Sequence, residues 1–239
     1  MKQLLNISLF LILLTTTINA QAFKWAKGIG SDDYLYSQNI STDASGNCYI
    51  TGYFRGTATF GTTQITSIGN SDIFIAKYDT EGNFQWVRKA GGTTNSDAGN
   101  GISADASGNC YITGYFQGTA TFGTTQITIS GYSDIFIAKY DTDGNFQWVK
   151  KAGGVEYDEG YGIAVDASGN CYVTGFFRQT ATFGTTQITS SGNSDIFIAK
   201  YDTDGNFQWV RKAGSTNYDY GNGIATDASG NCYVTGVFL

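Results

Sequence analysis

Apolar and β-branched residues in this chain occur in short runs that alternate with turns rich in Asp, Asn and Gly. Between positions 161 and 212 the runs are YGIAV (161–165), CYVTGFF (171–177), DIFIAKY (195–201) and FQWVRK (207–212). Such short runs, without a 3.6-residue period, are typical of strands. The turn strings DASGN (166–170) and DTDGN (202–206) fit hairpin loops, in which Asp accepts backbone hydrogen bonds and Gly adopts a positive φ. The pattern predicts two hairpins, joined by a connection over 182–192 that adds a short strand or a loop.

The whole pattern returns every 61 or 62 residues. Two residue types mark the period, namely Trp25, Trp86, Trp148 and Trp209 at one position and Cys48, Cys110, Cys171 and Cys232 at another. We divide the chain into copies 23–83, 84–145 and 146–206 and a partial copy 207–239. A unit this short cannot bury its own apolar face, so the copies are expected to stack on one another.

Both faces of the predicted strands are apolar. In 195–201, Ile196 and Ile198 lie on one face, and Phe197, Ala199 and Tyr201 lie on the other. Sheets packed on both faces are found in the blades of β-propellers, whereas a β-helix has shorter coils. The predicted fold is therefore all-β, a β-propeller with four-stranded antiparallel blades of about 61 residues each.

The predicted ring of blades is incomplete or truncated. Residues 23–27 match the last strand of a blade, three full sets of strands follow, and the final copy holds two strands. We expect the chain to be a fragment of a longer propeller protein, with imperfect closure or assembly with another copy as alternatives. An unfinished blade exposes a strand edge, so self-association is expected there through Tyr233, Val237, Phe238 and Leu239.

Residues 1–22 have the pattern of a signal peptide. Lys2 precedes an apolar stretch over 4–14, and Ala20 and Ala22 offer small-residue cleavage sites. The stretch is too short to span a bilayer. We expect domain 23–239 to be exported, secreted or at the cell surface, and not inserted in a membrane.

Charge and composition exclude some functions. The chain has 14 Lys and Arg against 20 Asp and Glu, a formal net charge of −6, and loss of Lys2 with the leader makes it one unit more negative. A nucleic acid partner is not expected, because the phosphate backbone requires a cationic surface. There is no His, so neither a Ser-His-Asp triad nor a His-based zinc site can form.

The four cysteines are expected to be free, although an exported chain with four cysteines commonly forms two disulfides. They occupy one position in successive copies, so the distance between blades is expected to exceed the roughly 7 Å Cα separation that a disulfide spans. A bridge or a metal role remains the alternative.

The strings DTDGN at 141–145 and 202–206 resemble the start of a calcium-binding loop. The Glu that completes such a loop is absent, and the first copy has Glu81 where the others have Asp143 and Asp204. We therefore interpret these strings as hairpin turns and expect no metal or cofactor, with calcium as the alternative.

One segment differs between copies, namely 30–38, 92–100, 154–161 and 215–222, just before the first strand of each blade. In a propeller these loops emerge on one face, where aromatic and acidic side chains can stack on sugars or dock a protein. The candidate ligand-binding residues are Asp33, Tyr34, Tyr36, Asp97, Tyr157, Asp158, Glu159, Tyr161, Tyr218, Asp219 and Tyr220. Free drift of surface loops after duplication is the alternative.

The string GIAVDASGNCYVTGFF (162–177), followed by SDIFIAKYDTDGNFQWVRKAG (194–214), resembles the SBBP-type β-propeller repeat of secreted and cell-surface bacterial proteins. The pattern of that repeat is D-x-x-G-N-x-Y-V-T-G, then D-x-F-x-x-K, then G-x-x-x-W. The resemblance covers essentially all of 23–239 and implies a propeller fold and a Bacteroidetes-like source. It implies no activity and no catalytic residues.

The leading hypothesis is a non-enzymatic extracellular module that binds a glycan or protein through the variable loops. One alternative is a purely structural repeat segment of a larger surface protein. Another is a secreted polysaccharide-active enzyme that uses paired acids. The adjacent pairs Asp32/Asp33 and Asp158/Glu159 fit this enzyme poorly, since neighbours on a strand point to opposite sides.

Overall fold

A computed structural model describes residues 24–239, and throughout this range the secondary structure is strand, turn and loop. The predicted signal peptide and Phe23 lie outside the described residues. The first blade contains β2 (Leu35–Thr42), β3 (Cys48–Phe54), β6 (Asp72–Tyr78) and β7 (Phe84–Ala90). The second contains β8 (Ala98–Ala104), β9 (Cys110–Phe116), β12 (Asp134–Tyr140) and β13 (Phe146–Gly154). The third contains β14 (Glu159–Val165), β15 (Cys171–Phe177), β18 (Asp195–Tyr201) and β19 (Phe207–Ala213).

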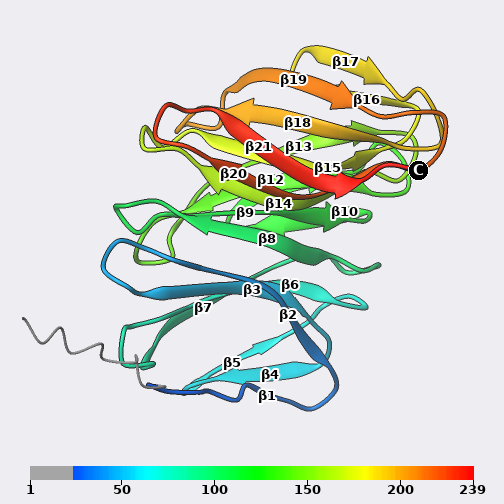
Figure 1. Ribbon diagram of the computed structural model, residues 1–239. Coiled ribbons are helices and arrows are strands. Elements are labelled where there is room, and N and C mark those ends of the chain that lie inside the picture. Colours follow the sequence, from blue (N-terminus) through cyan, green and yellow to red (C-terminus); the bar gives the residue numbers. More distant parts are fainter. Residues whose placement is uncertain (1–23) are drawn as a thin grey trace, which may run out of the picture.

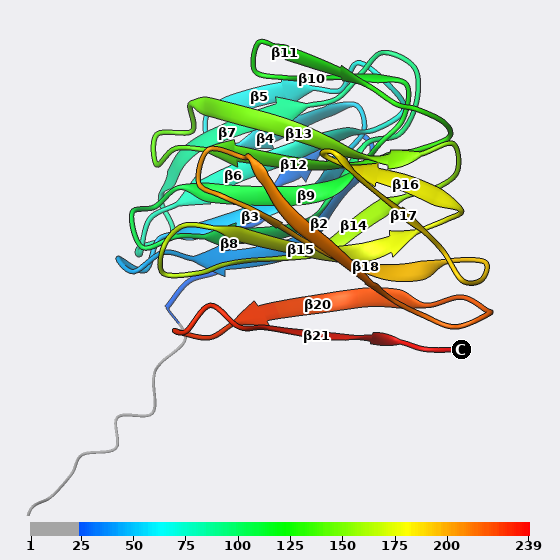
Figure 2. The ribbon, with the colours of Figure 1, turned by 90° about the horizontal axis from the view of Figure 1, so that it is seen from above.

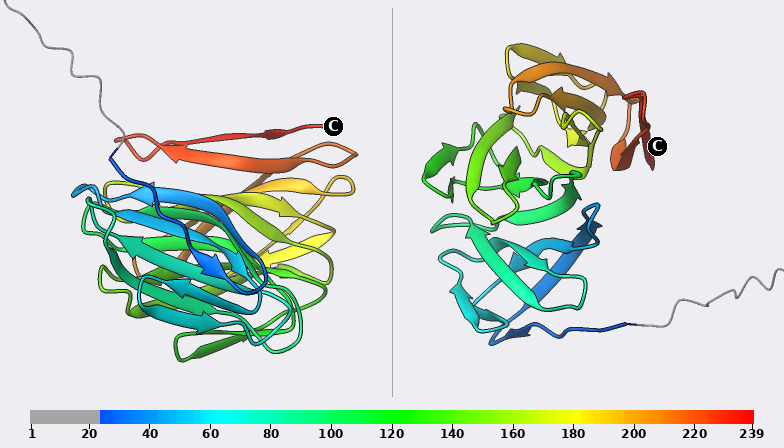
Figure 3. Two further views of the ribbon diagram at one scale, coloured as in Figure 1. Left: turned by 90° about the horizontal axis from the view of Figure 1, so that it is seen from below. Right: turned by 90° about the vertical axis from the view of Figure 1, so that its left-hand side faces the viewer.

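Each blade is an antiparallel sheet whose strands follow chain order, as in β14-β15-β18-β19. The strands β20 (Tyr220–Thr226) and β21 (Cys232–Val237) pair with each other in the last copy. The innermost strands contact one another in sequence, β2 with β8, β8 with β14, and β14 with β20. In Figure 1 the blades are stacked from the first at the bottom to the third at the top. The right-hand view of Figure 3 shows that they form an open arc. The all-β propeller prediction is confirmed, with a ring that does not close.

The connection between the second and third strands of each blade forms a further hairpin. These hairpins are β4 (Thr57–Phe60) with β5 (Thr63–Thr66), β10 (Thr119–Phe122) with β11 (Thr125–Thr128), and β16 (Thr180–Phe183) with β17 (Thr186–Thr189). Figure 2 shows β10 and β11 at the edge of the molecule farthest from β20 and β21. Each hairpin pairs with backbone that precedes its own blade: β4 with β1 (Gly30–Ser31), Thr121 with Gly91, and β16 with β13. The hairpins therefore join each blade to the backbone segment that precedes it.

Apolar clusters fill the space between neighbouring blades. Ile73 and Ile75 of β6 belong to the same cluster as Phe136, Ala138 and Tyr140 of β12. At the next boundary, the isoleucines of β12 belong to one cluster with the Phe, Ala and Tyr side chains of β18. Burial of each large side chain contributes roughly 1.5–3 kcal/mol. The prediction that both faces of this strand are packed is confirmed for β12, whereas in β18 Ile198 is only half-buried. Blade-to-blade contact is what stabilises the arc.

The prediction of a strand over 23–27 is wrong for the residues that the structure describes, because 24–29 form no strand. The indole Nε1 of Trp25 nevertheless donates to the carbonyl of Thr80 at 3.1 Å. Trp86 and Trp148 make the equivalent bonds to Thr142 and Thr203, at 3.0 and 3.1 Å. Trp25 thus keeps the packing role of the repeat without its backbone pairing.

All four cysteines are free, with Cys110 and Cys171 fully buried and Cys48 and Cys232 half-buried. Burial raises the pKa of the Cys171 thiol to about 12, so this thiol stays protonated. The apolar surface of Val237, Phe238 and Leu239 is exposed, and self-association through it stays a prediction. Within 24–239 there is no helix long and apolar enough to cross a bilayer.

Candidate binding face

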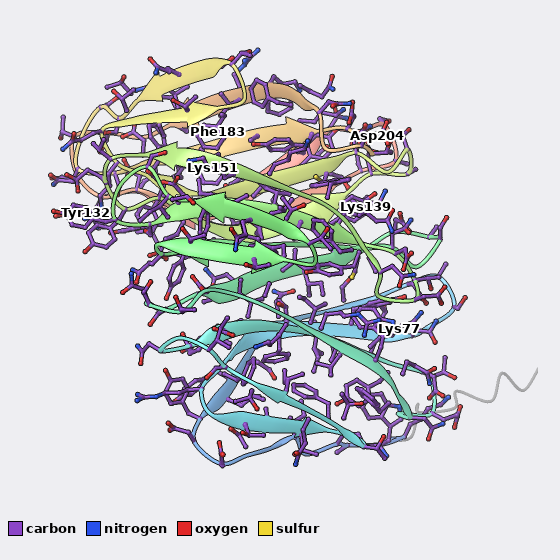
Figure 4. All side chains as sticks on the ribbon, turned by 180° about the vertical axis from the view of Figure 1, so that it is seen from behind. Lys77, Tyr132, Lys139, Lys151, Phe183 and Asp204 are labelled. Carbon is purple, nitrogen blue, oxygen red and sulfur yellow. The ribbon has the colours of Figure 1, made fainter. Side chains whose placement is uncertain are left out.

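The strand ends divide the molecule into two faces. The turn face carries the DASGN-type and DTDGN-type turns, 43–47, 79–83, 105–109, 141–145, 166–170, 202–206 and 227–231. The loop face carries the variable segments 92–97, 154–158 and 215–219, together with 129–133 and 178–179. In Figure 4, Tyr132 of the loop face lies at the left edge and Asp204 of the turn face at the right. The turns on one face are nearly identical between copies, and the segments that vary most lie on the other face.

The Asp that begins each turn accepts hydrogen bonds through both carboxylate oxygens from groups in or next to the same turn. Asp79 Oδ1 accepts the amides of Glu81 and Asn83 at 2.9 and 2.8 Å, while Oδ2 accepts Asn83 Nδ2 and Gln85 Nε2 at 2.9 and 3.1 Å. The side chain and amide of Asn83 hold the pKa of Asp79 below its usual value. The same bonds recur at Asp141 and Asp202. Among the described residues no group of three side chains suited to a metal ion is present.

Residues that are identical in the copies tie neighbouring blades together at the turn face. Lys77 Nζ donates to the carbonyl and the hydroxyl of Thr142 in the next copy, at 3.0 and 2.8 Å. Tyr49 is fully buried, and its hydroxyl donates to the carbonyl of Gly108 at 2.9 Å. The repeated Lys, Trp and Tyr therefore have a structural role, because their polar groups already bond to the neighbouring copy.

Three of the candidate acids are fully buried beneath the loop face: Asp97, Asp158 and Asp219. Asp158 Oδ2 accepts the Gly154 amide at 2.6 Å, and Oδ1 accepts the Arg178 amide at 2.9 Å. Asp97 and Asp219 bond the equivalent backbone amides. These carboxylates hold the variable loop against the end of the neighbouring strand, and they lie beneath the exposed rim.

Two of these acids, Asp97 and Asp158, each face a second buried carboxylate from the preceding blade. A Cβ built on Gly153 would lie 2.5 Å from Asp134 Oδ1 and 3.0 Å from Asp158 Oδ2, so both oxygens crowd the same point. Asp134 Oδ1 has no hydrogen-bond partner, whereas its Oδ2 lies 3.4 Å from Lys151 Nζ. Burial raises the pKa of Asp158 to about 7, and the charge of Asp134 adds to this rise. The first two boundaries match in this respect, since burial also raises the pKa of Asp97 to about 7, beside Asp72.

Two of the candidate tyrosines form a cluster on the first blade with Tyr53. The Tyr34 and Tyr36 ring centroids are 5.7 Å apart, and Tyr53 lies 6.1 and 5.3 Å from them. Asp33 pairs with Arg55 at 3.3 Å beside this cluster. Both partners are about half exposed, so the pair contributes little to stability.

The other candidate tyrosines gather with residues that the sequence did not single out. Tyr132 stacks on Tyr157 with centroids 5.1 Å apart and planes at 6°, and Tyr218 is parallel to Tyr220 at 6.4 Å and 3°. The guanidinium carbon of Arg178 lies between, 5.5 Å from the Tyr157 centroid and 5.7 Å from that of Tyr218. We call Tyr132, Tyr157, Arg178, Tyr218 and Tyr220 the tyrosine–arginine row.

The remaining candidates, Glu159 and Tyr161, lie beside the row and are half-buried. Burial raises the pKa of Glu159, while Tyr161 and Arg178 partly offset the rise. Beneath the row, Phe176 is buried, 5.6 Å from the Arg178 guanidinium and 5.1 Å from Tyr220. The row and Phe176 draw on the second, third and fourth copies.

The sequence held a signal for one of the two missed residues. At the position of Tyr132 the other copies have Asn70 and Asn193, and at that of Arg178 they have Arg55 and Gln117. These differences interrupt strings that are otherwise nearly identical. Departure from the repeat was therefore a signal for Tyr132, at a loop end outside the segment before the first strand, but not for Arg178, because the first copy also has Arg at that position.

Comparison with known proteins supports the repeat. The family model described as the SBBP β-propeller repeat matches residues 85–115, 147–175 and 208–237. An uncharacterized WD repeat-containing protein of Acanthamoeba polyphaga mimivirus is 35% identical over 115 residues, 41% of this chain and 8% of that protein. The regulatory protein FlaEY of Caulobacter vibrioides is 28% identical over 199 residues, 79% of this chain and 20% of that protein.

The chain thus spans a minor part of both relatives. The resemblance to the SBBP repeat is confirmed over the three matched segments, whereas the bacterial source and the export of the chain stay predictions. With three matched repeats and blades packed around an arc, the chain is a β-propeller repeat protein.

Proposed function

We propose that this chain is a non-enzymatic binding module, secreted or displayed at the cell surface, whose loop face takes a glycan or a protein. The observation that carries the proposal is the contrast between the two faces. Turn-face residues that are identical between copies form hydrogen bonds between blades, whereas several loop-face positions vary and carry exposed tyrosines. Tyr132 replaces an Asn of the other copies, and the position shared by Tyr34, Tyr157 and Tyr218 is Ser96 in the second copy. Tyr132, Tyr157 and Tyr218 are 58%, 37% and 40% exposed, against full burial of Tyr49.

Exposed tyrosines suit recognition, because each presents a large apolar ring with a polar end at a small cost in conformational entropy. The buried acids bonded to backbone amides hold the variable loops in one conformation, so little ordering is required when a ligand binds. Export rests on the pattern of residues 1–22, and cell fractionation tests it.

A glycan array and an affinity capture from extracellular extract test the binding function. The variant Tyr157→Ser gives the third copy the residue that the second has at Ser96, so it is expected to fold. The control Glu81→Asp gives the first copy the turn residue of the others, as in Asp143. We expect binding by the parent chain and by the control, and at least a tenfold loss in Tyr157→Ser. Folded protein that binds nothing in either assay would contradict the proposal and leave a structural role.

A further inference from the structure

Arg178 differs from the other arginines of the chain in having no acceptor for its side chain. Arg55 pairs with Asp33, Arg88 donates to the carbonyls of Gly144 and Asp143, and Arg211 donates to that of Val210. Among the described residues, Arg178 has no carboxylate within 4.0 Å and donates only through its backbone amide. Its Nε is buried without a partner. A buried donor without an acceptor costs free energy unless a ligand or water supplies the acceptor.

We propose that the tyrosine–arginine row binds an acidic polysaccharide and that Arg178 receives a uronate carboxylate. This inference rests on the proposed binding function and names its ligand class. A guanidinium pairs with a planar carboxylate through parallel N–H···O bonds, which a neutral hydroxyl cannot match. The flanking tyrosines then contact the sugars on either side of the acidic residue.

The carboxylates nearest to Arg178 are engaged elsewhere. Asp158 accepts backbone amides through both oxygens, and Glu156 accepts Gln179 Nε2 at 3.2 Å. Burial raises the pKa of Glu159, with Tyr161 and the charge of Arg178 partly offsetting the rise, and no ion pair within 4.0 Å joins Glu159 to Arg178. Other cations of the loop face have acceptors, as Arg55 has Asp33 and Lys151 has Ser130, so the positive charge of Arg178 is the one left available to a ligand among the described residues of this face.

The shape of the site favours an extended sugar chain over a small ligand or a peptide strand. The row is an open line of side chains that crosses from the second copy to the fourth. A peptide that adds to a sheet needs a free strand edge with backbone donors and acceptors. Here the contacting groups are rings and one guanidinium, which suit successive sugar units along a polymer.

The backbone next to Arg178 is held in place. Gln179 has φ of 53°, where the other copies have Gly56 and Gly118 with φ of 75° and 76°. A side chain in this left-handed region is costly and persists only when its surroundings fix it. Bonds from Gln179 to Ser190 Oγ at 3.0 Å and to Glu156 fix it here. Arg178 is thus presented in a preorganised position.

The variant Arg178→Gln tests the inference, because Gln117 occupies the equivalent position and shows that the repeat accepts this residue. Arg55→Gln is the matched control, since it removes the same charge at the same position of the first copy. The probes are oligogalacturonate, the same oligosaccharide with its carboxylates reduced to alcohols, and oligoglutamate. Calorimetry gives the dissociation constants, and circular dichroism confirms folding.

We expect oligogalacturonate to bind the parent and Arg55→Gln alike, with at least tenfold weaker binding in Arg178→Gln and for the reduced probe. Equal binding of the reduced probe, or no effect of Arg178→Gln, would overturn the acidic-sugar inference while leaving the binding function standing. Equal binding of oligoglutamate would overturn the choice of a sugar ligand. If no probe binds and the glycan array is also blank, both the inference and the proposed function fail.

Discussion

The guanidinium carbon of Arg178 lies 5.7 Å from the ring centroid of Tyr218, a residue of the next copy. Arg178 directly follows the second strand of its blade, and Tyr218 precedes the first strand of the following one. The exposed row on the loop face therefore exists only when two blades are packed correctly. Hydrogen bonds between blades on the turn face, such as that from Lys77 to Thr142, recur with the 61- or 62-residue period of the sequence. These bonds set that packing.

Those hydrogen bonds predict the effect of removing one hydroxyl. Tyr49→Phe leaves the carbonyl of Gly108 without its 2.9 Å donor at a fully buried site, so we expect a loss of about 1–2 kcal/mol in the free energy of unfolding. Tyr233→Phe changes the same repeat position where the ring is 60% exposed. This control is expected to stay within about 0.5 kcal/mol of the parent in urea denaturation. Equal losses in both variants would contradict a role for this hydrogen bond between blades.

The buried acids predict that the chain loses stability as pH rises above 4. In the unfolded chain Asp97 and Asp158 have the ordinary aspartate pKa of 3.8, whereas folding raises the pKa of each to about 7, chiefly because of burial. Below 3.8 both states are protonated. Between 4 and 7 only the unfolded state releases its proton, so the free energy of unfolding falls, by on the order of 4 kcal/mol per carboxyl.

Denaturation at pH 4.5 and pH 8 measures this difference. We expect Asp97→Asn and Asp158→Asn each to reduce it, because Asn does not titrate. The exposed Asp79, whose pKa is lowered, contributes in the opposite direction, but only as pH falls below about 4. A pH difference that both variants leave unchanged would show that these carboxyls do not titrate as described.

The strands were predictable because their limits are set by local chemistry. The runs over 171–177 and 195–201 match β15 and β18 residue for residue. A hairpin turn borders each one, 166–170 before β15 and 202–206 after β18, and the positive φ of Gly169 and Gly205 marks those turns. The hairpin β16–β17 was less predictable because its strands have only four residues each, too few to show a clear alternation. Its pairing with β13 depends on contacts that no local pattern encodes.

The binding face was only partly predictable, for a different reason. Asp97, Asp158 and Asp219 are polar residues in variable loops, a pattern that indicates exposure, yet they cap backbone amides from two segments about 20 residues apart. Arg178 directly follows a pair of phenylalanines, so the local pattern does not mark it as a binding residue. Its place beside Tyr218 depends on the packing of two copies.

The thiols are expected to differ in reactivity. Cys110 and Cys171 are fully buried and should react with a thiol reagent only on unfolding, whereas Cys48 and Cys232 are half-buried and should react sooner. Timed labelling followed by mass spectrometry measures the order. A loss of four hydrogens in the unreduced protein would reveal two disulfides and contradict the free state of all four cysteines.

Calcium removal is expected to leave the protein unchanged. The oxygens of Asp79, Asp141 and Asp202 already accept four hydrogen bonds each within their own turns. A chelator should therefore leave the melting temperature within error. An ion bound only to the folded state would stabilise it by mass action, so a fall of several degrees would favour the calcium alternative.

Hydrogen exchange of the chain with and without a ligand identified on the array tests most directly whether the loop face binds. We expect the ligand to slow exchange over 129–133, 154–161 and 215–220, the segments that carry the tyrosine–arginine row and its neighbours, and to leave the turns at 79–83 and 141–145 unchanged. Slowed exchange confined to those turns would contradict binding at the loop face.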